Sequence, residues 1–210
     1  MTNIESLNQR LYNIKPSIYN QNCVAEKAYH IFRPISKDLT DEEIKHYTDI
    51  NGRKHIHQYF MDIAYKIAER STCIKRQVGA IIVKDMKIVS CGYNGISKGL
   101  VNCTKDTCIL KPNGKCGKFP IHAEVNSCLF ATPEERKNAT MYITCQACSN
   151  CAAIIANSGI TRVIYDQQHA PEYNILNAVG IEELWLIDAI RQDLYYAEKA
   201  VYEKSLPIPI

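Results

Sequence analysis

Residues 122–151 read HAEVNSCLFATPEERKNATMYITCQACSNC, and this stretch carries the clearest chemical signal in the chain. Cys148 and Cys151 have the C-x-x-C spacing with which two thiolates bind one tetrahedral metal ion. His122 can supply a third ligand, which leaves a fourth position open to water. Glu124 can then transfer that water's protons without being a ligand itself. A C-x-x-C pair alone is often a structural zinc corner, but the order and spacing here favour a zinc site with an open position.

The order H-x-E followed by C-x-x-C resembles the signature of the zinc-dependent cytidine/deoxycytidylate deaminase superfamily. The resemblance implies that His122, Cys148 and Cys151 hold a catalytic zinc ion and that Glu124 is the catalytic acid and base. The chain departs from the signature at Ala147, where the family has proline. A proline would stiffen the turn that enters the helix, so the substitution concerns local rigidity and removes no ligand.

Hydrophobic periodicity around this stretch predicts an α/β protein. Alternating strands and helices after an initial hairpin indicate a three-layer α/β/α fold, with a central mixed sheet of about five strands, as in the cytidine deaminases. The expected helices cover 55–70, 122–131, 148–158, 174–179 and 190–204. The expected strands cover 77–83, 87–92, 140–144, 162–165 and 183–187. Both parts of the metal stretch would then lie at helix N-termini, whose partial positive charge stabilises thiolates.

The 210 residues suit one globular domain with extensions. We expect an N-terminal extension over 1–54 and a deaminase domain over 55–210, with its core at about 55–187 and a C-terminal helix. Thr40, followed by three acidic residues, is typical of a helix N-cap. His55 and His57 are expected at the surface or in a cap.

Composition narrows the class of protein. The formal charge of +3 and the lack of a dense Lys/Arg run argue against a stable nucleic-acid complex. No apolar leader or membrane-length run is evident, and the ten cysteines fall partly in metal-ligand spacings. We therefore expect a cytoplasmic protein with reduced thiols and no membrane association.

A second set of motifs is more specific about the substrate. Residues 70–83 read RSTCIKRQVGAIIV and residues 92–95 read GYNG, and both resemble the deoxycytidylate (dCMP) deaminase family, bacterial and phage type, over about 55–187. The resemblance implies hydrolytic deamination of dCMP to dUMP and ammonia by a zinc-bound hydroxide, supplying dUMP for thymidylate synthesis. It also implies that Asn94 contacts the deoxyribose or the base and that Tyr165 lies near the substrate. Arg76 is the candidate for the phosphate, because a guanidinium binds phosphate with two hydrogen bonds.

Some members of the family carry a second, structural zinc ion. The candidate ligands here are four cysteines outside the catalytic set: Cys73, Cys103, Cys108 and Cys116. Four thiolates would form a closed site that holds the irregular segment between residues 96 and 120 but does no chemistry.

Members are often homo-oligomers (hexamers or dimers) that dCTP activates and dTTP inhibits, which the resemblance makes an expectation here. The loop 95–99 reads GISKG, with serine where the family has proline, and this departure lies in the regulatory loop. Three alternatives stay open: a deaminase of another cytosine-type or related nucleoside or nucleotide, an editor of single-stranded nucleic acid, and a catalytically decayed zinc-stabilised binding protein.

Overall fold

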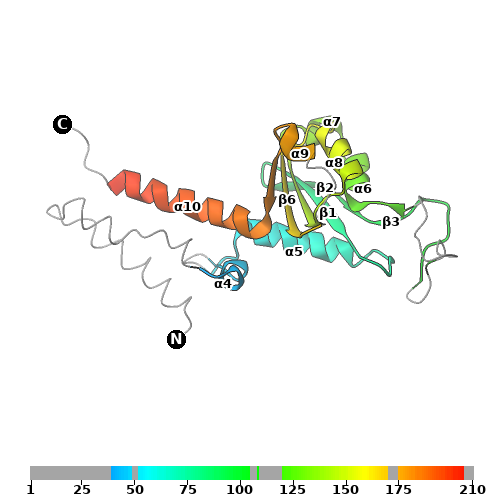
Figure 1. Ribbon diagram of the computed structural model, residues 1–210, viewed down its shortest axis with the longest axis horizontal. Coiled ribbons are helices and arrows are strands. Elements are labelled where there is room, and N and C mark those ends of the chain that lie inside the picture. The colour runs from blue at the N-terminus through cyan, green and yellow to red at the C-terminus, as the bar shows by residue number, and fades with distance from the viewer. Residues whose placement is uncertain (1–38, 49–51, 105–107, 109–119, 170–174, 206–210) are drawn as a thin grey trace. The chain divides into compact units, whose positions relative to one another are not determined.

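A computed structural model describes residues 39–48, 52–104, 108, 120–169 and 175–205 (Figure 1). The chain divides into two compact units, residues 59–186 and residues 1–58 with 187–210. The predicted domain over 55–210 stays a prediction. Among the described residues, no helix combines the length and the apolar character that crossing a membrane requires.

Five strands of the larger unit form one mixed sheet. They are β1 (Gly79–Lys84), β2 (Lys87–Tyr93), β5 (Thr140–Cys145), β6 (Arg162–Gln167) and β7 (Glu182–Trp185). The strand order is β2-β1-β5-β6-β7. β1 is antiparallel to β2 and to β5, whereas β5, β6 and β7 run parallel. The predicted mixed sheet of about five strands is confirmed.

The predicted hairpin closes through Asp85 and Met86, which both have positive φ, at 49° and 63°. Positive φ at both central residues is typical of the tight turns whose twist matches that of the flanking strands. A separate two-stranded ribbon of β3 (Gly95–Ile96) and β4 (Pro120–Ile121) was not predicted. It connects the loop after β2 to the residue before His122, and so fixes where the metal stretch begins.

The helices agree with the predicted pattern, with one addition. They are α4 (Asp41–Lys45), α5 (Ile56–Ala68), α6 (Ala123–Phe130), α7 (Pro133–Arg136), α8 (Ser149–Ala156), α9 (Ile175–Ala178) and α10 (Leu186–Ser205). Helix α7 was missed, although Thr132 and Glu135 form a capping box that a T-x-x-E pattern indicates. The last strand ends at Trp185, so its predicted extension to residue 187 is wrong: Leu186 and Ile187 begin α10.

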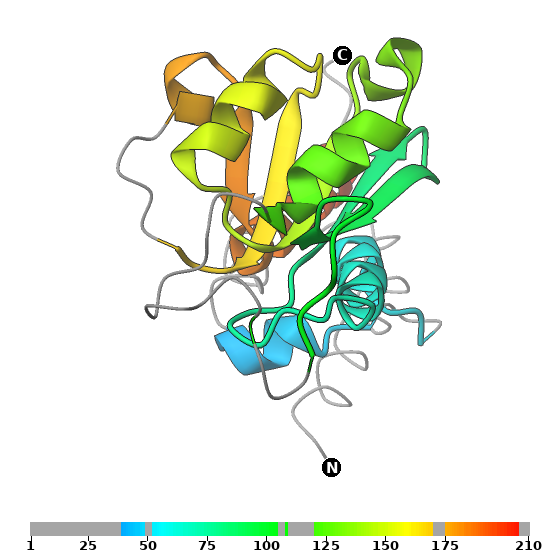
Figure 2. The same ribbon diagram turned by 90° about the vertical axis from the view of Figure 1, so that its right-hand side faces the viewer.

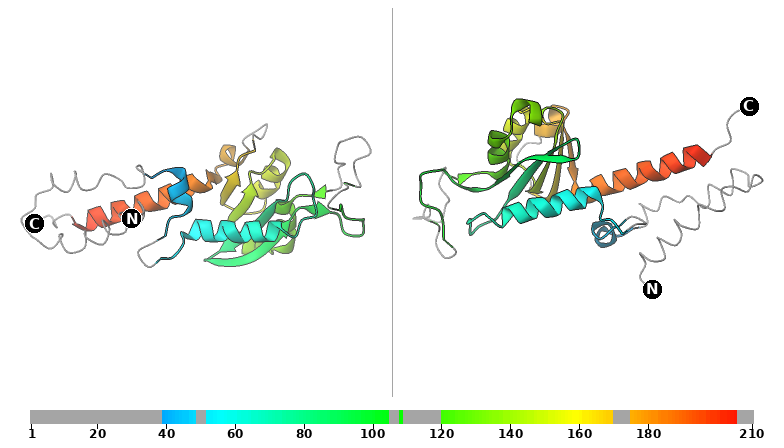
Figure 3. Two further views of the ribbon diagram at one scale, coloured as in Figure 1. Left: turned by 90° about the horizontal axis from the view of Figure 1, so that it is seen from below. Right: turned by 180° about the vertical axis from the view of Figure 1, so that it is seen from behind.

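Two glycines allow helices to lie against opposite faces of the β1–β2 pair. A Cβ on Gly79 would lie 2.0 Å from the carbonyl oxygen of Ala64 in α5. A Cβ on Gly92 would lie 2.4 Å from the backbone nitrogen of Ser127 in α6. Because Gly79 pairs with Tyr93 and successive side chains alternate, the two glycines face opposite sides. Figures 2 and 3 show α5 on one face of the sheet and α6 and α8 on the other.

The main hydrophobic core lies between the sheet and helices α6, α8 and α9. Ala80, Ile82, Met141, Ile143 and Val163 point into it from alternate strand positions, and all are fully buried. On the opposite face Phe60 of α5 packs against Tyr142, with ring centroids 5.3 Å apart. The α/β/α layering follows from this alternation, because each strand carries apolar residues on both faces.

The described part of the smaller unit centres on an acidic residue of α10. Asp193 Oδ2 lies 3.0 Å from His57 Nε2 and 3.7 Å from His55 Nε2. His57 is only 5% exposed, so the prediction of a surface or capping histidine is wrong for this residue. The N-cap prediction for Thr40 is confirmed by a complete capping box with Glu43.

Candidate active site

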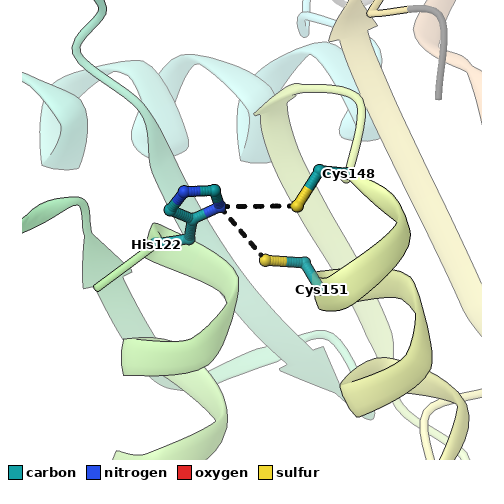
Figure 4. Close-up of side chains that lie close together, drawn as sticks. All are labelled: His122, Cys148 and Cys151. Carbon is teal, nitrogen blue, oxygen red and sulfur yellow. Dashed lines mark hydrogen bonds between the residues drawn. The ribbon is translucent and has the colours of Figure 1, made fainter. Parts of the chain in front are cut away.

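The predicted metal ligands come from the first residues of two neighbouring helices. His122 is the N-cap residue of α6, Cys148 is the N-cap residue of α8, and Cys151 lies in the first turn of α8. Neither N-cap side chain makes a capping hydrogen bond. The side chains of His122 and Cys148 therefore do not cap their helices. They point toward one another instead (Figure 4).

The three side chains have a spacing that fits one metal ion. His122 Nδ1 lies 3.6 Å from Cys148 Sγ and 3.3 Å from Cys151 Sγ. Two ligands at ordinary zinc–nitrogen and zinc–sulfur bond lengths in a tetrahedral site are roughly 3.5 Å apart. These residues form the one group of three or more potential metal ligands that the described part of the chain contains. Their donor set of one imidazole and two thiols is that of a zinc site with room for a fourth ligand.

The surroundings of Cys151 also favour a bound metal ion. It is 2% exposed, and burial, followed by the nearby Glu124 and Cys148, raises the pKa of its thiol. A bound cation is what would offset both effects and stabilise the thiolate.

Glu124 lies in the first turn of α6 and is 4% exposed. Burial raises the pKa of its carboxyl group, against smaller opposing effects from a backbone hydrogen bond, His122 and Cys151. A buried carboxyl group with a raised pKa can hold a proton near neutral pH and release it again. Glu124 lines the same cavity as His122 and Cys148 and is not part of the group of potential metal ligands, which is compatible with its predicted role in proton transfer.

A cavity of about 330 Å³ opens beside the metal ligands. Its lining residues are Cys73, Lys75, Arg76, Val78, Asn94, Pro120, His122, Ala123, Glu124, Cys145, Gln146, Cys148 and His169. Of the predicted substrate residues, Arg76 and Asn94 line it. Tyr165, half-buried on β6, is not one of these lining residues, and its proximity to the substrate stays a prediction.

The lining residues that were not identified from the sequence include Lys75, Gln146 and His169. Lys75 adjoins Arg76 and Gln146 lies inside the metal stretch, so proximity to known candidates could have indicated both. His169 follows β6 and carries no local signal. Its backbone nitrogen donates to Gln146 Oε1 at 3.3 Å, which ties this loop to the cavity wall.

Asn94 is bound to the backbone beside the cavity. Its Oδ1 accepts from the Val78 nitrogen at 2.8 Å, and its Nδ2 donates to the Arg76 carbonyl oxygen at 2.9 Å. One amide hydrogen and one acceptor position remain for a ligand. Asn94 therefore shapes the segment 76–78, and its predicted contact with the substrate stays a prediction.

Arg76 reaches across the cavity wall to a cysteine. Its Nη1 donates to Cys145 Sγ at 2.8 Å. Burial raises the pKa of the Cys145 thiol, and the neighbouring guanidinium opposes this to a smaller extent. Cys145 therefore accepts this hydrogen bond as a neutral thiol.

Of the four cysteines predicted to bind a second zinc ion, two lie close together in the structure. Cys103 Sγ and Cys108 Sγ lie 3.7 Å apart. Cys73 lines the cavity and does not join these two in a group of three close ligand atoms among the described residues. Cys116 lies outside the described residues. The four-cysteine site stays a prediction.

Comparison with known proteins identifies the family and the individual proteins that this chain resembles. Residues 54–167 match the family model of the cytidine and deoxycytidylate deaminase zinc-binding region. The deoxycytidylate deaminase of Mycobacterium phage D29 is 36% identical over 125 residues, which cover 53% of this chain and 94% of the phage protein. That of Saccharomyces cerevisiae is 34% identical over 131 residues, covering 59% of this chain and 42% of the yeast protein. The crystal structure of dCMP deaminase from cyanophage S-TIM5 in complex with dCMP and dUMP is 26% identical, with a TM-score of 0.54, and the match covers 62% of this chain and 96% of that one.

Proposed function

This chain belongs to the cytidine and deoxycytidylate deaminase family, and on that premise we propose that it hydrolyses dCMP to dUMP and ammonia. The observation that carries the proposal is that His122, Cys148 and Cys151 form one group of potential metal ligands, beside a cavity that His122, Cys148 and the buried Glu124 line. The relatives named deoxycytidylate deaminase and the dCMP-bound structural neighbour support this choice of substrate.

His122, Cys148 and Cys151 would hold one zinc ion. When bound there, zinc supplies the reaction by lowering the pKa of a water molecule, so that hydroxide is available near neutral pH. The first turns of α6 and α8 add their partial positive charge to the same point.

Glu124 moves the protons. It accepts one from the attacking water and delivers it to N3 of the cytosine ring, which makes C4 more electrophilic. The water oxygen adds to C4. Glu124 then takes the second proton from the hydroxyl group now on C4 and transfers it to the amino group, so that the C4–N bond breaks, ammonia leaves and C4 keeps a carbonyl oxygen. Burial raises the pKa of Glu124, so that its protonated and ionised forms are close in free energy near neutral pH. The carboxyl group can therefore both accept and release a proton.

The cavity wall would bind the nucleotide. We assign the phosphate to Arg76, and the sugar or base edge to the remaining donor and acceptor of Asn94. Tyr165 completes the proposed substrate residues through the resemblance alone.

We also propose a second, structural zinc ion. The 3.7 Å separation of Cys103 Sγ and Cys108 Sγ supports it, because this is the spacing of two thiolates on one tetrahedral ion. The remaining ligands are proposed as Cys73 and Cys116. Measurement of two zinc ions per chain, falling to one in Cys103→Ser, would test the site.

Homo-oligomeric assembly and control by dCTP and dTTP are further proposals. Leu129 and Phe130 on α6 support assembly, since they are 68% and 75% exposed. Sedimentation of the parent and of Phe130→Asp would test it, with a monomeric parent contradicting the proposal. A cytoplasmic location is a further proposal, supported by the grouping of Cys148 and Cys151 with His122 as potential metal ligands.

Conversion of dCMP to dUMP, followed by chromatography with cytidine, dCTP and single-stranded DNA as competing substrates, tests the reaction. Glu124→Ala should retain zinc and lose essentially all turnover. Glu134→Ala is the matched control, because this exposed carboxylate on α7 lies outside the cavity. Near-normal turnover by Glu124→Ala would exclude the mechanism, and turnover of single-stranded DNA in preference to dCMP would exclude the substrate.

A further inference from the structure

Cys145 is the last residue of β5 and lies three positions before the metal ligand Cys148. It is 6% exposed, yet its sulfur reaches the cavity wall and accepts the hydrogen bond from Arg76 Nη1 at 2.8 Å. The end of a central strand is a rigid support. Arg76, which belongs to a loop before β1, is thereby attached to the same strand end that leads to the metal ligands.

The backbone of Arg76 is fixed independently. Asn94 accepts from Val78 and donates to the Arg76 carbonyl oxygen, so one amide links both sides of the segment. The guanidinium and the backbone of Arg76 are thus held from two different elements. An arginine that is held in this way loses less side-chain freedom when it binds a ligand.

The charges that surround Arg76 favour an anion. Lys75 and His169 line the same cavity, and Glu124 is the one acidic side chain among its described lining residues. A neutral thiol orients the guanidinium without neutralising it. A carboxylate at the position of Cys145 would orient Arg76 equally well, but would compete with a phosphate for the same donors.

We propose that Cys145 is a positioning residue, which aims Arg76 at the 5′-phosphate and thereby sets the preference for a nucleotide over a nucleoside. The inference rests on the proposed function for the identity of the ligand. Four of the five guanidinium N–H groups remain after the contact with Cys145, enough for a bidentate phosphate interaction.

Equilibrium binding of the product separates this inference from catalysis. The probes are dUMP and deoxyuridine, measured by calorimetry on the zinc-loaded protein, and the quantity of interest is the dissociation constant of deoxyuridine divided by that of dUMP. In Cys145→Ala this ratio should fall about tenfold, as expected for the loss of one hydrogen bond to a charged group. Cys145→Ser keeps an acceptor and should restore most of the ratio, whereas Cys145→Asp should lower it at least as far as alanine.

Cys128→Ala is the matched control, because Cys128 is 4% exposed in the core and lies outside the cavity. It reports the effect of removing a buried thiol without removing the contact to Arg76. In an Arg76→Ala background, Cys145→Ala should cause no further change in the ratio, which keeps the test decisive even if the single variants differ in stability.

An unchanged ratio in Cys145→Ala, an equal loss in Cys128→Ala, or additive effects of the Cys145 and Arg76 substitutions would overturn the inference. A parent that binds dUMP no better than deoxyuridine would overturn it as well. A parent that binds dUMP with the predicted dependence on Cys145 but does not deaminate dCMP would refute the proposed function alone.

Discussion

Replacing Gly79 by alanine should strongly destabilise the larger unit, although such a change in a strand usually stabilises. Without a steric conflict, Gly→Ala stabilises by about 0.4–1 kcal/mol, because the unfolded chain loses freedom. At Gly79 the new Cβ would lie 2.0 Å from the Ala64 oxygen and 2.7 Å from the Ala68 nitrogen. Both are backbone atoms of α5, so relief requires the helix and the strand to move apart. We expect a loss of about 3 kcal/mol, at the upper end of the range for overpacked sites.

The measurement is urea unfolding followed by the fluorescence of Trp185, the single tryptophan of the chain, which lies on β7. Gly95→Ala is the matched control, since the nearest atom to its added Cβ is a side-chain carbon of Tyr93 at 3.9 Å. The control should change the free energy of unfolding by less than about 0.5 kcal/mol. If Gly79→Ala lost no more than the control, the contact between α5 and β1 would not be as close as described.

Three further outcomes follow from the structure. A chelator should lower the melting temperature and added zinc should restore it; in His122→Ala both effects on thermal unfolding should be smaller, because only the proposed second zinc site then remains intact. Burial, and then His57, lower the pKa of His55 to about 4 from 6.5, against a smaller opposing effect of Asp193. The free energy of unfolding should therefore be greatest above pH 6.5 and fall by about 2–3 kcal/mol toward pH 4, as the unfolded chain takes up the proton first; urea unfolding of His55→Gln across this range should lack that part of the slope. Asn94→Ala removes both backbone contacts of its amide and should lower the free energy of unfolding by about 2 kcal/mol and raise KM for dCMP, which denaturation and steady-state kinetics check; an unchanged KM would contradict its place in the cavity wall.

Local patterns predicted most of the fold because the deciding interactions are close in sequence. The β1–β2 hairpin, the capping box at Thr40 and the helix ends before Gly159 and Gly180 all depend on residues a few positions apart. Both of these glycines have positive φ, at 90° and 78°, a conformation that ends helices. The grouping of His122, Cys148 and Cys151 was likewise predictable, because these residues begin two helices whose first turns lie close together.

What the sequence did not reveal depends on contacts between distant segments. The burial of His57 follows from Asp193, which lies far along the chain on α10. The contact between Arg76 and Cys145 joins residues 69 positions apart, and neither residue belongs to a pattern that predicts the other. Asn94 was predicted as a ligand contact, but its amide also bonds to the backbone of 76–78, which no periodicity indicates.

The chain caps its helices in two ways, and the difference bears on how it could be engineered. Where no chemistry is required, Thr40 and Thr132 cap α4 and α7 with full hydrogen-bonded boxes. At α6 and α8 the N-cap residues are His122 and Cys148, whose side chains make no such bond. Each position forgoes about 1 kcal/mol relative to serine or aspartate. A screen that selected for thermostability alone in the metal-free protein would therefore favour substitutions at these two positions, and its most stable products would be catalytically inert.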